Sequence, residues 1–141
     1  MGLRKKKSNT GFKLYELTEE EIYKIMPKLK KRGLDKITDN DKRLYYLRVW
    51  LITEIQPLHK LPNYSKRCWD RVGCYELDHI LSISYSYLEG IPPHKVGSLE
   101  NLRFIPKKEN RSKSFKLTED SHKVLRKFKQ ERDIYKKRNK K

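Results

Sequence analysis

The sequence has few of the features that stabilise small secreted proteins or place a chain in a membrane. Cys68 and Cys74 are the two cysteines among its 141 residues, too few for a disulfide scaffold. No apolar stretch is long enough for a membrane-spanning helix or for the hydrophobic part of a signal peptide. We therefore expect a protein of the reducing cytoplasm that has no membrane partner.

Acidic residues are also scarce relative to basic ones. The chain has 35 Lys and Arg against 18 Asp and Glu, a formal net charge of +17. From Lys107 to the end there are fifteen basic residues and five acidic ones. Such basic runs neutralise phosphates and release counterions, which gives salt-dependent binding to a polyanion. The charge favours a nucleic-acid partner, although a solubilising surface or a ribosomal-type RNA binder explains it too.

The length fits one domain with extensions, and a hydrophobic content of 35% allows only a small core. We predict an α+β protein with a basic flexible arm over residues 1–13 and a single domain over residues 14–141. Within that domain we expect an N-terminal helical part over 18–57, a central motif over 74–114 and a basic helix over 118–138.

Two features define the expected N-terminal helices. Thr18 and Glu21 have the spacing of a capping box, and Pro27 should split the helix that follows them. A longer helix is expected from about Asn40 to Ile55, capped by Thr38 or Asp39. Its apolar stripe would consist of Leu44, Leu47, Leu51 and Ile55, with Tyr46 and Trp50 packing nearby rather than stacking on bases.

The central part predicts strand, excursion, strand and helix, in that order. Strands are expected at 74–81 and 102–105, separated by an excursion over 82–98 that carries one helical turn at 85–89. Pro106 then precedes a helix over 107–114, because proline is tolerated at the start of a helix. The last helix should begin at Thr118.

Chemically competent residues fall within this central part. The segment Glu76-Leu77-Asp78-His79-Ile80 lies in the first expected strand. The segment from Leu99 to Ile105 contains Asn101 and then the second strand, and the segment from Lys108 to Lys113 contains Asn110. An imidazole has an ordinary pKa of about 6.5 and can take a proton from water near neutral pH. Asp78 and Asn110 offer the hard oxygen ligands that suit Mg²⁺ or Mn²⁺.

This ordered set resembles the HNH endonuclease family, and specifically its His-Asn-Asn branch. The resemblance implies a small ββα-metal core in which His79 is the general base and Asp78 and Asn110 hold one Mg²⁺ or Mn²⁺. It also implies that Asn101 pins the loop between the strands and orients the histidine. The basic residues around the motif would then bind the phosphate backbone: Arg103, Arg111, Lys113, Lys107 and Lys108.

The sequence departs from the family pattern in two places. Many members carry paired Cys-x-x-Cys motifs for structural zinc, but Pro106 and Glu109 stand where the second pair would be. Cys68 and Cys74 alone do not make a tetrahedral site, so we expect no structural zinc. Ser82 also replaces a proline that many members have after the Asp-His-Ile run.

The resemblance implies a metal-dependent endonuclease that hydrolyses DNA phosphodiester bonds, similar to phage-encoded or homing-type members acting in a bacterial or phage-infected cytoplasm. One active site per chain cuts one strand, so we expect nicking, or a double-strand cut where two chains act as a homodimer. The alternative is a catalytically inactive nucleic-acid-binding module that keeps the same fold.

Overall fold

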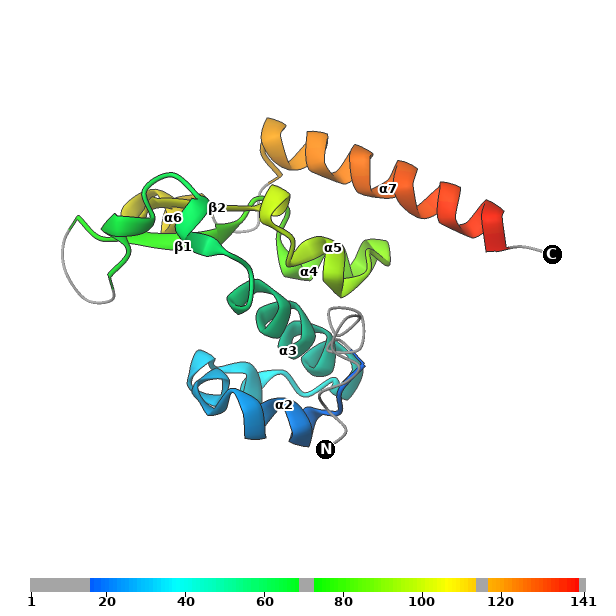
Figure 1. Cartoon of the computed structure of the whole chain (residues 1–141), viewed down its shortest axis with the longest axis horizontal. Coiled ribbons are helices and arrows are strands. Elements are labelled where there is room, and N and C mark those ends of the chain that lie inside the picture. Colours follow the sequence, from blue (N-terminus) through cyan, green and yellow to red (C-terminus); the bar gives the residue numbers. More distant parts are fainter. Residues whose placement is uncertain (1–15, 69–72, 114–116, 140–141) are drawn as a thin grey trace.

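The structure, a computed structural model, describes residues 16–68, 73–113 and 117–139, without the side chains of 31, 35, 113 and 132–139. The predicted basic arm over residues 1–13 lies outside this range. A two-stranded antiparallel sheet is combined with helices, which confirms the α+β class (Figure 1). Within the described residues, no helix has the length and apolar character needed to cross a membrane.

The N-terminal part consists of short helices followed by one long helix. Helix α2 spans Glu19–Ile25 and starts at the predicted capping box, in which Thr18 and Glu21 bond each other's backbone N–H groups. The chain breaks before Pro27 and continues as 3₁₀ turns η2 (Pro27–Arg32) and η3 (Leu34–Lys36). Proline lacks the donor needed to continue the preceding helix, so the predicted split is confirmed.

Helix α3 (Asn40–Glu54) begins where the sequence predicts it. The Asp39 carboxylate accepts hydrogen bonds from the backbone N–H groups of Asp41 at 2.9 Å and Lys42 at 3.1 Å, which caps the helix. Leu47 and Leu51 are buried, but Ile55 is 48% exposed, so the predicted stripe is wrong at that position. Ile55 is the C-cap residue, beyond the last turn that packs on other elements.

The hairpin and its following helix agree closely with the sequence expectation. Strand β1 (Tyr75–His79) pairs antiparallel with β2 (Leu102–Pro106), and α6 (Lys107–Lys113) follows at once and packs on both strands. Two 3₁₀ turns, η4 (Leu58–Lys60) and η5 (Tyr64–Lys66), lead from α3 toward β1. Helix α6 was expected over residues 107–114, and residue 114 lies outside the described range.

The excursion between the strands has more structure than predicted. It holds α4 (Ile83–Glu89), α5 (Pro93–Val96) and the 3₁₀ turn η6 (Leu99–Asn101), where one helical turn was expected. A four-residue helix is too short to show a hydrophobic period. Gly97 ends α5 against α3, where a Cβ atom would lie 2.9 Å from Ile52 Cγ2 and 3.0 Å from the Val49 carbonyl oxygen. Only glycine allows this close approach.

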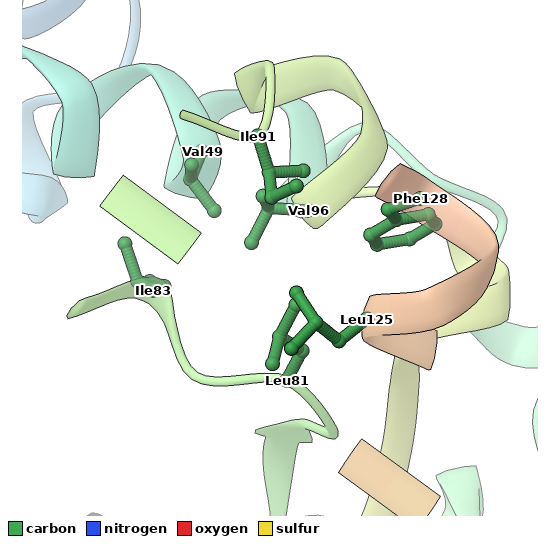
Figure 2. Packing of buried hydrophobic residues seen from close by; sticks show 7 residues of the cluster. All are labelled: Val49, Leu81, Ile83, Ile91, Val96, Leu125 and Phe128. Carbon is green, nitrogen blue, oxygen red and sulfur yellow. The ribbon is translucent and has the colours of Figure 1, made fainter. Parts of the chain in front are cut away.

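Helix α7 (Glu119–Asn139) closes the molecule on the side of α4 and α5 (Figure 1). Its first turn is capped by Thr118, whose hydroxyl oxygen accepts the Ser121 N–H at 3.1 Å. Leu125 and Phe128 enter a core shared by the excursion and α3 (Figure 2). The buried members of this core are Val49, Leu81, Ile83, Ile91, Val96, Leu125 and Phe128.

Trp50 connects the separate parts of the interior. It is half-buried and packs against three apolar clusters: the one around Phe128, the one around Ile22 and Leu29, and the one formed by Leu58, Leu77, Leu102 and Phe104. Tyr46 packs against the first two. The prediction that both aromatics serve packing is confirmed, and Trp50 brings α3 directly to the hairpin.

Candidate functional site

The last residues of β1 carry the candidate site, and they point to two different faces of the sheet. Side chains alternate along a strand, so Glu76 and Asp78 share one face while Leu77 and His79 share the other. Contacts agree with this alternation, because Glu76 meets α6 whereas His79 meets α3. Asp78 and His79 are therefore adjacent in sequence but separated by the plane of the strand.

His79 is held by two residues of α3. Its Nε2 lies 2.9 Å from Thr53 Oγ1, and its ring meets the Trp50 ring edge-on with centroids 4.9 Å apart. The Thr53 hydroxyl donates its single proton to the Val49 carbonyl at 2.7 Å. Nε2 must then be the donor in the contact with Thr53, which leaves Nδ1 as the unprotonated nitrogen of the neutral ring.

This assignment predicts the effect of changing Thr53. Thr53→Val keeps the shape but leaves a buried imidazole N–H without its acceptor, so we expect the free energy of unfolding to fall by about 1–3 kcal/mol. The neutral His79 ring should also lose its preference for the Nε2–H tautomer, which nitrogen NMR of the side chain measures. Thr53→Ser keeps the hydroxyl and should keep the tautomer. A wild-type ring protonated on Nδ1 would contradict the assignment.

On the other face, Asp78 is engaged by a neighbouring strand residue. Arg103 lies directly opposite Asp78 in the strand register, and its Nε donates to Asp78 Oδ2 at 2.9 Å. A second contact joins Arg103 Nη1 to Asp120 Oδ2 at 3.4 Å. Asp78 is 6% exposed. Arg103 is expected to bind phosphate, and that role stays a prediction; in the structure its guanidinium pairs with the predicted metal ligand Asp78.

Asn110 reaches β1 from α6 and meets Glu76. Its Nδ2 donates to Glu76 Oε1 at 2.9 Å, and the Arg111 guanidinium lies 3.9 Å from Glu76 Oε2. Glu76 lies two residues before Asp78 on the same face, so the structure brings two carboxylates and one amide to this side of the hairpin. Glu76 is thus a third oxygen donor that the predicted ligand pair did not include.

Asn101 holds the chain immediately after His79. It is fully buried, and its Oδ1 accepts the Leu81 N–H at 2.7 Å. Its Nδ2 donates to the carbonyls of Leu81 at 3.2 Å and Val96 at 2.9 Å, while its own carbonyl accepts the Ile80 N–H at 2.8 Å. These bonds tie the exit of β1 to the excursion, as a residue that positions His79 would. Its part in catalysis stays a prediction.

The remaining predicted phosphate-binding residues lie on α6. Lys107 is half-buried, whereas Lys108 and Arg111 are exposed. The side chain of Lys113 lies outside the described residues. Part of the basic character of α7 is offset locally, since Lys127 pairs with Glu100 and Lys129 lies 3.0 Å from Glu89.

The oxygen donors suit a hard divalent cation. In the described part of the chain, no three His, Cys, Asp or Glu side chains gather closely enough to hold a metal ion. The candidate ligands Asp78, Glu76 and Asn110 are not such a group of three, because they comprise two carboxylates on one strand face and one amide. Mg²⁺ is usually held by one or two carboxylates and keeps several waters, so these residues fit such an ion once Arg103 turns away from Asp78.

Two arginines from outside the motif also approach this region. Arg32 of η2 stacks on Trp50, and its guanidinium carbon lies 3.8 Å from the ring centroid. Arg32 and Arg67 both donate hydrogen bonds to the Glu54 carboxylate. Arg67 also forms a parallel bridge with Tyr75, and the disulfide between Cys68 and Cys74 ties this segment to β1. No local pattern identified either arginine, because each reaches the site only through tertiary contacts.

No family model, curated protein or solved structure matches this chain. The assignment of roles therefore depends on the order of the motif residues and on the contacts described above.

Proposed function

We propose that the protein is a metal-dependent endonuclease of the HNH type that hydrolyses phosphodiester bonds in DNA. The observation that carries the proposal is the meeting of Asn110 with Glu76, on the same face as Asp78, in a strand that ends in His79. A hairpin followed at once by a helix is the arrangement that the resemblance implies for a ββα-metal core.

The chain's own residues account for most of the reaction. His79, with Nε2–H donated to Thr53, presents Nδ1 to take a proton from the attacking water. The water oxygen bonds to phosphorus, the bond to the 3′ oxygen breaks, and the departing oxygen is protonated by solvent. Because His79 and Asp78 face opposite sides of β1, the phosphodiester must lie across the end of the strand to meet both. Arg111 would offset charge on the phosphate.

Asp78, Glu76 and Asn110 are the residues that would hold Mg²⁺ or Mn²⁺. When bound, such an ion supplies Lewis-acid stabilisation of the extra negative charge on the phosphoryl oxygens. Arg103 would then exchange Asp78 for its second partner Asp120 or for a substrate phosphate. The protein would act on DNA in a bacterial or phage-infected cell, and as a homodimer where both strands are cut.

We expect the activity to require a divalent ion. Supercoiled plasmid incubated with the protein and Mg²⁺ or Mn²⁺ should convert to open circles, and gel electrophoresis measures this conversion. EDTA should abolish the conversion without preventing DNA binding, because binding depends on the basic surface. Equal cleavage in EDTA would contradict metal dependence.

A catalytically inactive nucleic-acid-binding module is the second candidate function. The ion pair between Arg103 and Asp78 favours it, since a carboxylate already neutralised by a guanidinium attracts a cation less strongly. Plasmid that binds tightly and stays supercoiled with every divalent ion tested would support this module and reject the nuclease.

A further inference from the structure

A buried hydroxyl of α7 reaches the end of strand β1. Ser121 is 1% exposed, and its Oγ donates to the Ile80 carbonyl oxygen at 2.6 Å. Ile80 is the first residue after His79, where β1 ends, and lies 41 positions before Ser121 in the chain. The basic C-terminal helix, which lies outside the central motif over 74–114, therefore contacts the backbone directly beside the candidate general base.

The position of Ser121 in α7 shows that this contact replaces a local one. Thr118 caps α7, and Ser121 is the third helical residue, from which a Glu or Gln returns to the cap backbone in a capping box. Glu21 makes this return in α2, where its Oε1 accepts the Thr18 N–H at 2.8 Å. Ser121 has a shorter side chain, and its hydroxyl donates to Ile80 instead. The first turn of α7 thus has a tertiary hydrogen bond in place of a local cap bond.

Hydrogen bonds within the same turn fix the orientation of the Ser121 hydroxyl. A hydroxyl has one proton, and that of Ser121 goes to Ile80. In the 3.0 Å contact between the Thr118 and Ser121 hydroxyl oxygens, Thr118 is therefore the donor. Thr118 Oγ1 also accepts the Ser121 N–H at 3.1 Å. The Ser121 hydroxyl cannot rotate without breaking bonds on both sides.

Ser121 completes the set of bonds that hold the two residues after His79. Asn101 binds three backbone groups of this pair, namely the N–H of Ile80 and both the N–H and the carbonyl of Leu81. Ser121 binds the fourth, the Ile80 carbonyl. The peptide group that follows Ile80 is thus held at both edges, by Ser121 at its carbonyl and by Asn101 at its N–H. The exit of β1 is held by α7 as well as by the excursion.

Apolar packing keeps α7 in register with this contact. Leu125 lies one turn after Ser121, on the same helix face, and shares a buried core with Leu81 and Phe128 (Figure 2). We propose that Ser121 is a positioning residue for His79, because it fixes the backbone at the residue that follows the imidazole. This inference rests on the proposed nuclease function, and it makes α7 part of the structure that orients the general base.

Single-turnover nicking of supercoiled plasmid by the whole protein tests the proposal. Ser121→Ala removes only the hydroxyl, and we expect the nicking rate to fall by about 5- to 20-fold, because a small displacement of a catalytic group is costly. DNA affinity in EDTA should stay unchanged, since the hydroxyl is buried and uncharged. Ser86→Ala is the matched control: Ser86 is 0% exposed, but its hydroxyl donates to the nearby Ser82 carbonyl at 2.8 Å. It should nick at the wild-type rate.

The His79 ring provides a measurement that a general loss of stability would not change. In the native state of Ser121→Ala, the nitrogen NMR signals of this ring should shift, because its contact with Thr53 depends on where β1 ends. In Ser86→Ala they should stay at the wild-type positions. Unchanged His79 signals in Ser121→Ala would overturn the proposal, and so would nicking as fast as that of Ser86→Ala.

A further measurement uses the wild-type protein and does not depend on the folding of a variant. The Ser121 hydroxyl proton, buried and bonded to Ile80, should exchange slowly enough with water to give its own proton NMR signal at low temperature. Ser112 is exposed and should give none. A Ser121 hydroxyl that exchanges as fast as that of Ser112 would also overturn the proposal.

The two proposals can fail separately. If the wild type nicks plasmid and Ser121→Ala nicks as fast as Ser86→Ala, the role of Ser121 is rejected and the nuclease stands. If the wild type never nicks plasmid with any divalent ion, the nuclease is rejected. In that case a shift of the His79 signals in Ser121→Ala alone still supports the positioning contact, and unchanged signals reject it.

Discussion

Replacing His79 with alanine is expected to lower the rate of plasmid cleavage by about 10²- to 10⁴-fold, the usual contribution of a general base. Thr53 and Trp50 hold the imidazole at the end of β1, so the variant removes a positioned base rather than a mobile one. DNA affinity in EDTA should stay nearly unchanged, because the ring carries none of the basic surface. Single-turnover nicking kinetics with saturating protein separate the two effects.

His59→Ala is the matched control for this prediction. His59 is exposed on the 3₁₀ turn η4, so this substitution removes an imidazole that lies outside the candidate site. Its cleavage rate should equal that of the wild type. If His79→Ala cleaves as fast as His59→Ala, the assignment of the general base is wrong, even if the protein is a nuclease.

Replacing Asn101 with alanine is expected to produce the largest loss of stability. The change leaves the Leu81 N–H and the carbonyls of Leu81 and Val96 without their buried partner. At about 1–3 kcal/mol for each unsatisfied group, discounted for local rearrangement, the free energy of unfolding should fall by about 3–5 kcal/mol. Urea denaturation measures it, and the melting temperature should fall by roughly 10–17 °C.

Asn40→Ala is the control, because Asn40 is exposed at the start of α3 and accepts one surface hydrogen bond from Arg43. Its cost should stay within about 0.5 kcal/mol. A similar small cost for Asn101→Ala would mean that the three bonds do not hold the loop.

The carboxylate variant Asn101→Asp adds a dependence on pH. An ionised Asp at this buried position faces two carbonyl oxygens, which raises its pKa in the folded state above the ordinary value of about 3.9. Stability would then be greatest below that ordinary value and would be lost as the pH rises through the folded-state pKa. Unfolding curves at several pH values check this sign.

Local chemistry explains why many helix and strand positions were predictable. The Thr18 and Glu21 capping box, the break at Pro27 and the Asp39 cap each depend on residues within one turn of each other. The run from Cys74 to Leu81 likewise predicted a strand, which the structure places at Tyr75–His79. Ile55 was predicted wrongly because its exposure depends on which elements pack beyond the end of α3, and α5 was missed because it is too short to have a period.

The candidate site was likewise predictable from the sequence in its residue types but not in their contacts. Residue types and their order determined which residues have chemistry to offer: the carboxylate Asp78, the imidazole His79 and the amides Asn101 and Asn110. The tertiary structure alone decided how they are partnered: Asp78 with Arg103, Asn110 with Glu76, and His79 with Thr53. Partners far apart in the chain meet through packing of whole elements, and spacing along the sequence does not encode that.

The net charge and the ordered motif were therefore properties of the sequence by itself, and they suffice to predict a chain that binds a polyanion and carries hydrolytic residues. The placement of Arg32 and Arg67 beside the hairpin was decided only by the fold. Trp50 packs against all three apolar clusters, and burial of its ring brings the N-terminal helices, with Arg32, onto the edge of β1. Arg67 reaches the same edge through its bridge with Tyr75.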